Sequence, residues 1–379
     1  MPQENGRPTP IPLTVLTGFL GAGKTTLLNR LLQDPALSDT VVIVNEFGEI
    51  GLDHLLVETV DEDMILLGAG CLCCTVRGDL IAALEDLLRK RDNGRIKAFR
   101  RVVIETTGLA DPAPILHALI AHPYLSLRFR LQGVVTVVDA VNGCSTLDEH
   151  PEAVRQAAVA DILVMTKRDL AGAEPDQLAA RLRQLNPGAR LEGPDVPAET
   201  LLGGLFGLDG KSADVREWLG AEHAAPDRHG EHRDHHHAHH GHGHHPGHDH
   251  HHDVNRHDAA IRAFHLVSDT PVPRPAFEMF LDLIRSAHGP KLLRLKGLVA
   301  MADDPERPVV VHGVQHVVHA PVTLDAWPDA DRRSRLVLIV RDLDPAFVER
   351  IWDAFLGRPR IDGPDAAALS DNPLAIPNG

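Results

Sequence analysis

Basic side chains are scarce in this sequence. Its 379 residues include 38 Lys and Arg against 53 Asp and Glu, which gives a formal net charge of −15. Nucleic acids and anionic membranes are bound by clustered Lys and Arg. The surplus of acid therefore argues against a nucleic acid or a membrane as the main partner.

Long apolar runs are also missing. No stretch approaches the roughly 20 residues of a membrane-spanning helix. The polar start, with Pro2, Pro8 and Pro10, has no signal-peptide core. We therefore expect a cytoplasmic protein, and at roughly 150 residues per domain its length predicts two or three domains.

Cysteine is the third scarce residue. Only four are present, and Cys71, Cys73 and Cys74 stand together as C-L-C-C, while Cys144 stands apart and is predicted to be a small buried residue. This is no disulfide framework, and in a reducing compartment such spacing indicates metal or redox work. Three thiolates suit Zn²⁺ or Cu(I) and suit Mg²⁺ badly.

Three protein ligands would leave a fourth coordination position open, as a metal carrier needs for ligand exchange. Glu46 or a histidine could complete the shell, and the spacing does not choose between them. The alternative to a metal site is a redox dithiol or a packed cysteine cluster.

A phosphate-binding pattern lies near the start of the chain. Residues 18–25 are G-F-L-G-A-G-K-T, between a strand predicted over 11–16 and a helix predicted over 24–32. The glycines let backbone N–H groups approach an anion, Lys24 can neutralise the β- and γ-phosphates, and Thr25 can bind Mg²⁺. The residues predicted to contact the nucleotide phosphates are Gly18, Gly21, Ala22, Gly23, Lys24, Thr25 and Thr26.

Apolar runs and amphipathic stretches then alternate as far as about residue 210, which predicts an α/β domain with a mainly parallel sheet over residues 11–210. Residues 1–10 are predicted to be a flexible N-terminus. The predicted strands after the first are 40–44, 64–67, 101–104, 133–138 and 162–165, and the further helices are 79–90, 112–121, 153–160 and 175–185. Ligands should bind at the carboxyl ends of these strands.

Polar motifs follow several of the predicted strands. Residues 45–53, N-E-F-G-E-I-G-L-D, combine carboxylates and glycines, and Glu49 or Asp53 is a candidate to position an attacking water. In E-T-T-G after the fourth strand, Glu105 can hold Mg²⁺ and Gly108 can sense the γ-phosphate.

A guanine-type motif, T-K-R-D, begins at Thr166, directly after the strand predicted over 162–165. A carboxylate at Asp169 can accept two N–H groups from guanine, which adenine does not offer. We therefore predict that Asp169 selects GTP, and that Thr166 and Lys167 contribute to nucleotide binding.

Taken together, G-F-L-G-A-G-K-T-T, N-E-F-G-E-I-G-L-D, G-C-L-C-C, E-T-T-G-L-A-D-P and T-K-R-D-L resemble the CobW-type metal-chaperone GTPases, over about residues 14–170. Residues 259–358 resemble that family's C-terminal domain. The resemblance implies GTP hydrolysis coupled to metal transfer to a client metalloprotein, with zinc the best-supported metal and cobalt among the others. It also implies that Thr166 is ordinary where other guanine motifs have Asn.

Residues 211–258 have a different composition. Between residues 229 and 257 there are 15 histidines in 29 positions. Such a segment cannot bury a core, so we predict a disordered linker that binds Zn²⁺, Ni²⁺, Co²⁺ or Cu²⁺ weakly at many sites. A solvated linker with incidental metal affinity is the alternative.

Beyond residue 258 the pattern predicts a small α+β domain up to residue 358, followed by a loose tail over 359–379. The predicted strands are 261–267, 291–301, 308–312, 315–319 and 335–341, and the helices are 274–287 and 344–356. His312, His316 and His319 gather there, and we favour structural histidines over a second metal site. Gly313 suggests a turn between the first two.

Two functions remain open at this point. In a chaperone, GTP binding organises the cysteine site and hydrolysis changes its metal affinity. In a storage or sensing protein, the histidines buffer metal and the GTPase is slow and regulatory. No arginine finger is evident, so turnover should be slow until a second copy in a homo-oligomer, or a client, accelerates it.

Overall fold

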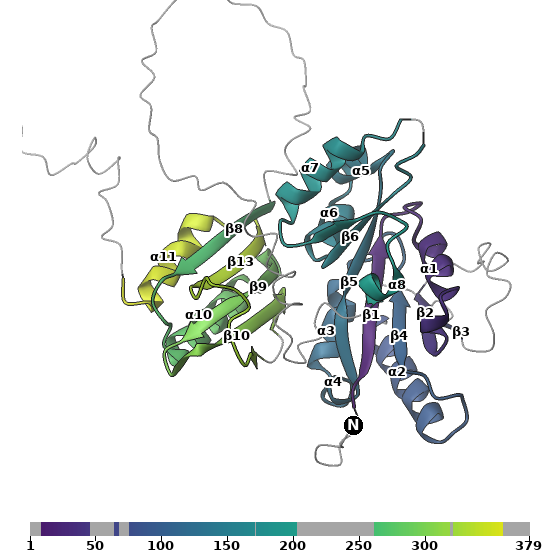
Figure 1. Cartoon of the computed structure of the whole chain (residues 1–379), viewed down its shortest axis with the longest axis horizontal. Helices are drawn as coiled ribbons and strands as arrows, with labels where there is room; N and C mark the ends of the chain where they lie inside the picture. The colour runs from purple at the N-terminus through teal and green to yellow at the C-terminus, as the bar shows by residue number, and fades with distance from the viewer. Residues whose placement is uncertain are drawn as a thin grey trace, which may run out of the picture.

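The computed structural model describes residues 9–45, 64–67, 76–170, 172–202, 261–318 and 321–358, which form two domains that lie side by side (Figure 1). We refer to the described residues up to 202 as the N-terminal domain and to those from 261 as the C-terminal domain. Within these ranges, no helix has the length and apolar character needed to cross a membrane.

A parallel sheet forms the centre of the N-terminal domain. Its strands pair in the order β3-β2-β4-β1-β5-β6-β7, and all the pairings are parallel. The strands are β1 Ile11–Gly18, β2 Thr40–Asn45, β3 Met64–Leu67, β4 Arg101–Glu105, β5 Phe129–Asp139, β6 Ile162–Thr166 and β7 Arg190–Glu192. The central strands are buried on both faces, as their continuous apolar runs predict.

Helices cover both faces of this sheet (Figure 1). One face packs against α1 and α8, and the other packs against α2, α3, α6 and α7. The helical segments are α1 Lys24–Leu32, η1 Pro35–Leu37, α2 Val76–Asp92, α3 Ala113–Ala121, α4 Pro123–Arg128, α5 Gly143–Glu149, α6 Pro151–Ala158, α7 Pro175–Leu185 and α8 Ala198–Leu202. The predicted α/β fold class is confirmed.

The strand register aligns the ends of the central strands. Leu16 in β1 is opposite Glu105, Gly18 is opposite Val137, and Asp139 is opposite Thr166. Because the strands are parallel, all of these carboxyl ends lie at one edge of the sheet. This edge carries the predicted phosphate loop and the polar motifs that follow β4 and β6.

The C-terminal domain is an antiparallel sheet covered by two long helices. Its strands run in the order β11-β10-β9-β13-β8, and β12 pairs with β10. The elements are β8 Ile261–Ser268, α10 Arg274–His288, η6 Gly289–Lys291, β9 Leu292–Met301, β10 Asp304–Val314, β11 Val317–Val318, β12 Val322–Thr323, β13 Ser334–Arg341 and α11 Pro345–Phe355. The predicted α+β class of this domain is confirmed.

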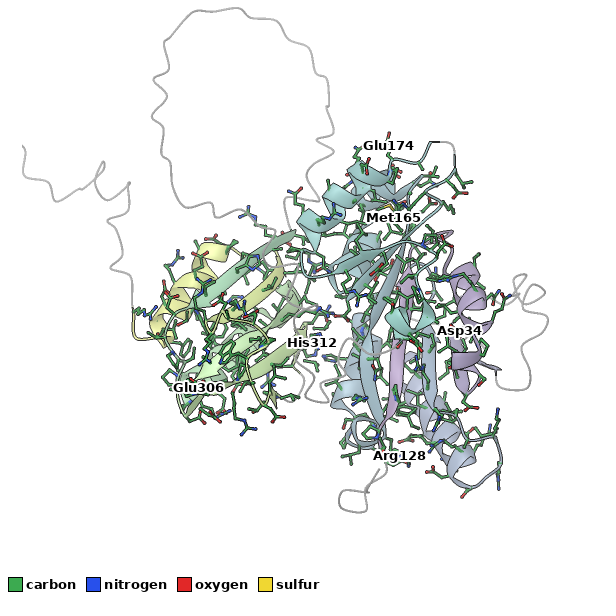
Figure 2. The ribbon with its side chains drawn as sticks, in the orientation of Figure 1. Asp34, Arg128, Met165, Glu174, Glu306 and His312 are labelled. Carbon is green, nitrogen blue, oxygen red and sulfur yellow. The ribbon has the colours of Figure 1, made fainter. Side chains whose placement is uncertain are left out.

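The two faces of this second sheet have different neighbours. One face packs on α10 and α11, with Phe280 and Trp352 in its core. The other face turns to the N-terminal domain, where Leu293 and Ile339 pack against Ala158 of α6. His312 lies between the two domains (Figure 2).

The histidines near this interface do not follow the predicted strand pattern. β10 runs through Gly313 to Val314, so the glycine does not break the strand as predicted. The turn comes at Gln315, whose φ is 53°, and it brings His316 against His117 of α3, with 3.6 Å between ring centroids. Within the described ranges no group of three or more His, Cys, Asp or Glu could hold a metal, and His319 lies outside them.

Short elements were missed by the sequence prediction. The helices α4 and α5 and the strand β7 fall in segments where the apolar pattern was too short to predict them. Cys144 lies in α5, where it is half-buried, and burial raises the pKa of its thiol. Cys144 thus packs against the core as a partly buried residue, not a fully buried one as predicted.

The core of the C-terminal domain gives a stability prediction. Phe280 is fully buried on α10, with its ring centroid 5.0 Å from that of Trp352. Phe280→Ala should lower the free energy of unfolding by about 3–5 kcal/mol, measured by urea denaturation. Met279→Ala is the matched control, because the adjacent side chain is 61% exposed and its loss should cost under about 0.5 kcal/mol. Equal losses for the two variants would contradict the packing described here.

Candidate nucleotide and metal site

The phosphate loop joins β1 to α1 through left-handed glycines. Gly18 has a φ of 144°, and a Cβ there would collide with the carbonyl oxygen of Val137. Gly23 has a φ of 94° and is the N-cap of α1, so the helix begins at Lys24. This arrangement points the free N–H groups of the first turn of α1 towards the loop. The loop can therefore hold an anion against a helix N-terminus.

Lys24 lies folded over this loop. Its ammonium donates hydrogen bonds to the carbonyl oxygens of Gly18 at 3.0 Å and Phe19 at 3.1 Å. Burial lowers the pKa of Lys24, and the nearby charge of Glu105 opposes that effect. A cation in this position can neutralise phosphate oxygens bound in the loop.

Thr25 and Glu105 form a pair of oxygen ligands beside the loop. The Thr25 hydroxyl donates to Oε1 of Glu105 at 2.9 Å, although the two residues are 80 positions apart in the sequence. Glu105 is buried at the end of β4. A hydroxyl and a carboxylate are ligands that suit Mg²⁺, so these two residues fit the cation that accompanies a nucleoside triphosphate.

The segment after Glu105 is held tightly against the phosphate loop. The backbone N–H of Thr106 donates to the carbonyl of Leu16, and its hydroxyl donates to Thr17 at 2.8 Å. A Cβ on Gly108 would lie 2.6 Å from the backbone nitrogen of Leu20. Gly108 therefore packs directly on the phosphate loop, and its contact with a γ-phosphate stays a prediction.

The T-K-R-D segment contacts the phosphate loop from the other side. The Thr166 hydroxyl donates to the carbonyl of Ala22 at 2.7 Å. Lys167 has a φ of 57°, and its ammonium lies 2.7 Å from Oδ2 of Asp139. Burial alone would raise the pKa of Asp139, but the hydrogen bonds from Lys167 and from the N–H of Val141 lower it overall. Asp169 is exposed, so its carboxylate is accessible to the base of a nucleotide.

Six of the predicted site residues lie outside the described residues. They are Glu46, Glu49, Asp53, Cys71, Cys73 and Cys74. The strands before them are described: Asn45 ends β2, Leu67 ends β3, and the two are register partners. Both strands run parallel to β4, so they end at the edge of the sheet that carries Glu105.

Comparison with known proteins agrees with this geometry. Residues 12–192 match the model of the CobW/HypB/UreG nucleotide-binding domain, and residues 261–356 match that of the cobalamin synthesis protein cobW C-terminal domain. The zinc chaperone YjiA of Escherichia coli is 33% identical over 92% of this chain and 98% of its own length. The chain belongs to the CobW/HypB/UreG family.

One further relative matches a smaller part of the chain, and a solved structure matches most of it. The zinc-regulated GTPase metalloprotein activator 1 of Schizosaccharomyces pombe is 40% identical over 44% of this chain and 41% of its own length. Among solved structures, the zinc-bound YjiA GTPase from E. coli superposes with a TM-score of 0.65 and 26% identity, covering 92% of this chain and 99% of that one. The predicted family and its two-domain fold are confirmed.

Three side chains at this site were not predicted. Asp139 closes β5 beside Lys167, Asn142 donates to Asp139 at 3.2 Å, and Gln156 donates to the loop around Gly108. Asp139 could have been found, since it directly follows an apolar run that ends at the functional edge of the sheet. Gln156 gives no such signal, because it lies inside a helix far along the chain.

The hydrogen bond from Thr166 to the phosphate loop gives a prediction about stability. Thr166→Val keeps the shape of the side chain but removes the donor to Ala22, and so leaves a buried carbonyl without that bond. We expect the free energy of unfolding to fall by about 1–3 kcal/mol in urea denaturation. Thr166→Ser retains the hydroxyl and is the control. A Val variant as stable as the Ser variant would show that this hydrogen bond does not hold the loop.

Proposed function

We propose that this protein is a GTP-hydrolysing metallochaperone that binds zinc at the C-L-C-C motif and delivers it to a client metalloprotein. Its cofactors would be GTP and Mg²⁺, and Zn²⁺ would be the cargo, with Co²⁺ or Ni²⁺ as further candidates. Hydrolysis would be slow without a partner. The phosphate loop and its contacts support the nucleotide half of this function, and the C-L-C-C motif supports the metal half.

The observation that carries the nucleotide half is the contact between Thr25 and Glu105 beside the phosphate loop. The contact joins the first turn of α1 to the end of β4 and supplies oxygen ligands next to Lys24. Mg²⁺, when bound, would neutralise charge on the β- and γ-phosphate oxygens. Asp169 and Lys167 would recognise guanine, while Thr166 ties their segment to the loop.

In hydrolysis, water attacks the γ-phosphorus while the bond from that phosphorus to the β–γ bridging oxygen breaks, giving GDP and phosphate. Lys24 would stabilise the negative charge that builds on the leaving oxygen. Gly108 would contact the γ-phosphate and lose that contact in the GDP state. Glu49 or Asp53 would orient the attacking water.

The metal half rests on the thiolates of Cys71, Cys73 and Cys74, with Glu46 as a candidate fourth ligand. Thiolates favour Zn²⁺ over the hard cation that accompanies GTP. The names of the relatives from E. coli and S. pombe support zinc. β3 ends at Leu67 and α2 begins at Val76, so the motif lies between two elements of the nucleotide domain.

A storage or sensing role is the second candidate. It is favoured by the 15 histidines between residues 229 and 257, which offer many weak ligands. The two roles differ in one property. A chaperone's zinc affinity must depend on the nucleotide, because a ligand with equal affinity for two states shifts neither.

Zinc affinity is therefore the first measurement to make. It would be determined by chelator competition with Mg²⁺ and either GDP or a non-hydrolysable GTP analogue, on protein lacking residues 229–257. We expect a change of at least tenfold between nucleotides, about 1.4 kcal/mol. The change should vanish when Cys71, Cys73 and Cys74 are replaced by Ser. Equal affinities in both nucleotide states would favour the storage or sensing role.

Guanine selection gives a second test. Asp169→Ala should reduce the preference for GTP over ATP at least tenfold, because hydrogen bonds to a charged group contribute about 1.5–3 kcal/mol each. Competition with a fluorescent nucleotide would measure it. Asp176→Ala removes an exposed carboxylate from the neighbouring helix α7 and should leave the preference unchanged. An unchanged preference in the Asp169 variant would assign base selection elsewhere.

A further inference from the structure

A buried side chain of α6 contacts the loop that borders the phosphate loop. Gln156 of α6 is 1% exposed. Its Nε2 group donates to the carbonyl of Gly108 at 3.1 Å and to the carbonyl of Ala110 at 2.9 Å. Both donor hydrogens of one amide are thereby used on the same short loop, which fixes the distance of that loop from α6.

On its opposite side, this loop packs closely against the phosphate loop. Gly108 already packs on Leu20, with the closest approach 2.6 Å for an added Cβ. Gln156 lines a small pocket together with Leu20 and Ala22 of the phosphate loop. A displacement of Gly108 therefore has to change the bonds to Gln156, or else shift α6 itself.

The far end of α6 is held by the C-terminal domain. Arg294 of β9 donates to the carbonyl of Val159 and to Asp161, just beyond the helix. Lys296 of the same strand lies 2.7 Å from Asp161, whose side chain is fully buried. The backbone N–H of Val134 completes the carboxylate's partners. These contacts begin three residues after Gln156, less than one helical turn away.

The two contacts share one rigid element. α6 is short, running from Pro151 to Ala158, and its inner face is buried at Ala153, Val154 and Ala157. Because a packed helix shifts as a unit rather than bending, a change at Val159 and a change at Gln156 are coupled. The C-terminal domain and the loop around Gly108 are therefore both held by α6.

We propose that Gln156 is a positioning residue for the γ-phosphate-sensing loop, and that α6 couples this loop to the seating of the C-terminal domain. The inference rests on the proposed GTPase function. A γ-phosphate that favours one position of the loop also favours one position of α6. It thereby favours one position of β9 relative to the N-terminal domain. By linkage, a client that binds the C-terminal domain in that seating would strengthen GTP binding by the same factor.

The test is the affinity of the full chain for fluorescent GDP and for a fluorescent non-hydrolysable GTP analogue, each with Mg²⁺. Gln156→Met keeps the length of the side chain and removes both donors. We expect the ratio of analogue affinity to GDP affinity to change by at least about fivefold, with GDP affinity unchanged, because GDP has no γ-phosphate for the loop to contact. Gln132→Met, another buried glutamine, lies on β5 and should leave the ratio unchanged.

The interdomain step needs a second variant. Lys296→Met removes one cation while Arg294 still pairs with Asp161, so the buried carboxylate keeps a partner. It should change the same affinity ratio in the same direction, and Lys291→Met, in the C-terminal domain but bonded to the carbonyl of Asp342, should not. In the double variant Gln156→Met/Lys296→Met, the change should fall short of the product of the single changes.

Each outcome has a defined meaning. An unchanged ratio in Gln156→Met, or equal weakening of GDP and analogue, would overturn the positioning role. A double variant equal to the product of the singles would overturn the coupling through α6. Failure of the wild-type chain to bind either nucleotide would instead overturn the proposed function itself, and the inference with it.

Discussion

Parallel pairing of β1 with β4 and β5 is the constraint on which the site depends. It places Gly18, Glu105 and Asp139 at one edge of a sheet although they are far apart in the chain. A parallel sheet requires a crossover between paired strands, and the helices of those crossovers cover both of its faces. The same topology therefore buries the sheet and concentrates its polar loops where no helix covers them. Which residues meet at that edge therefore follows from strand order rather than from local sequence.

The second constraint is the buried charge at Asp161. Burial on its own would raise the pKa of this carboxyl, but the charges of Arg294 and Lys296 and the N–H of Val134 lower it, and the group stays ionised. Removing all of these partners would leave an uncompensated charge in the interior, at a cost of about 3–5 kcal/mol or more. A separated C-terminal domain would carry the mirror problem, with two cations on an exposed sheet face. The pairing thus specifies how the domains sit, whatever its net contribution to stability.

Local patterns were enough to predict the phosphate loop and most long elements. The glycines before Lys24, the apolar run of β1 and the leucines of α1 all lie within about twenty residues, so their signals reinforce one another. The interface could not be predicted in this way. Residues 291–301 were predicted to be a strand, but nothing local shows that Arg294 and Lys296 meet a carboxylate from another domain. Gly313 misled the prediction because its neighbours on β9 and β11 hold it in the sheet. Gln156 was also missed, because the carbonyl groups that it contacts, those of Ala110 and Gly108, lie 46 and 48 positions away in the sequence.

The chemistry of the two proposed cation sites explains how they could serve one cycle without competing. Thr25 and Glu105 offer only oxygen, which suits a small hard cation bound together with phosphates. The C-L-C-C motif offers sulfur, which holds Zn²⁺ far more strongly than Mg²⁺. Mg²⁺ would therefore not displace Zn²⁺ from the thiolates, and Zn²⁺ would bind the oxygen ligands more weakly than it binds the thiolates. What must connect the sites is then movement of the protein rather than exchange of ions between them. The loop that follows Glu105 is suited to begin that movement, because it touches the phosphate loop on one side and α6 on the other.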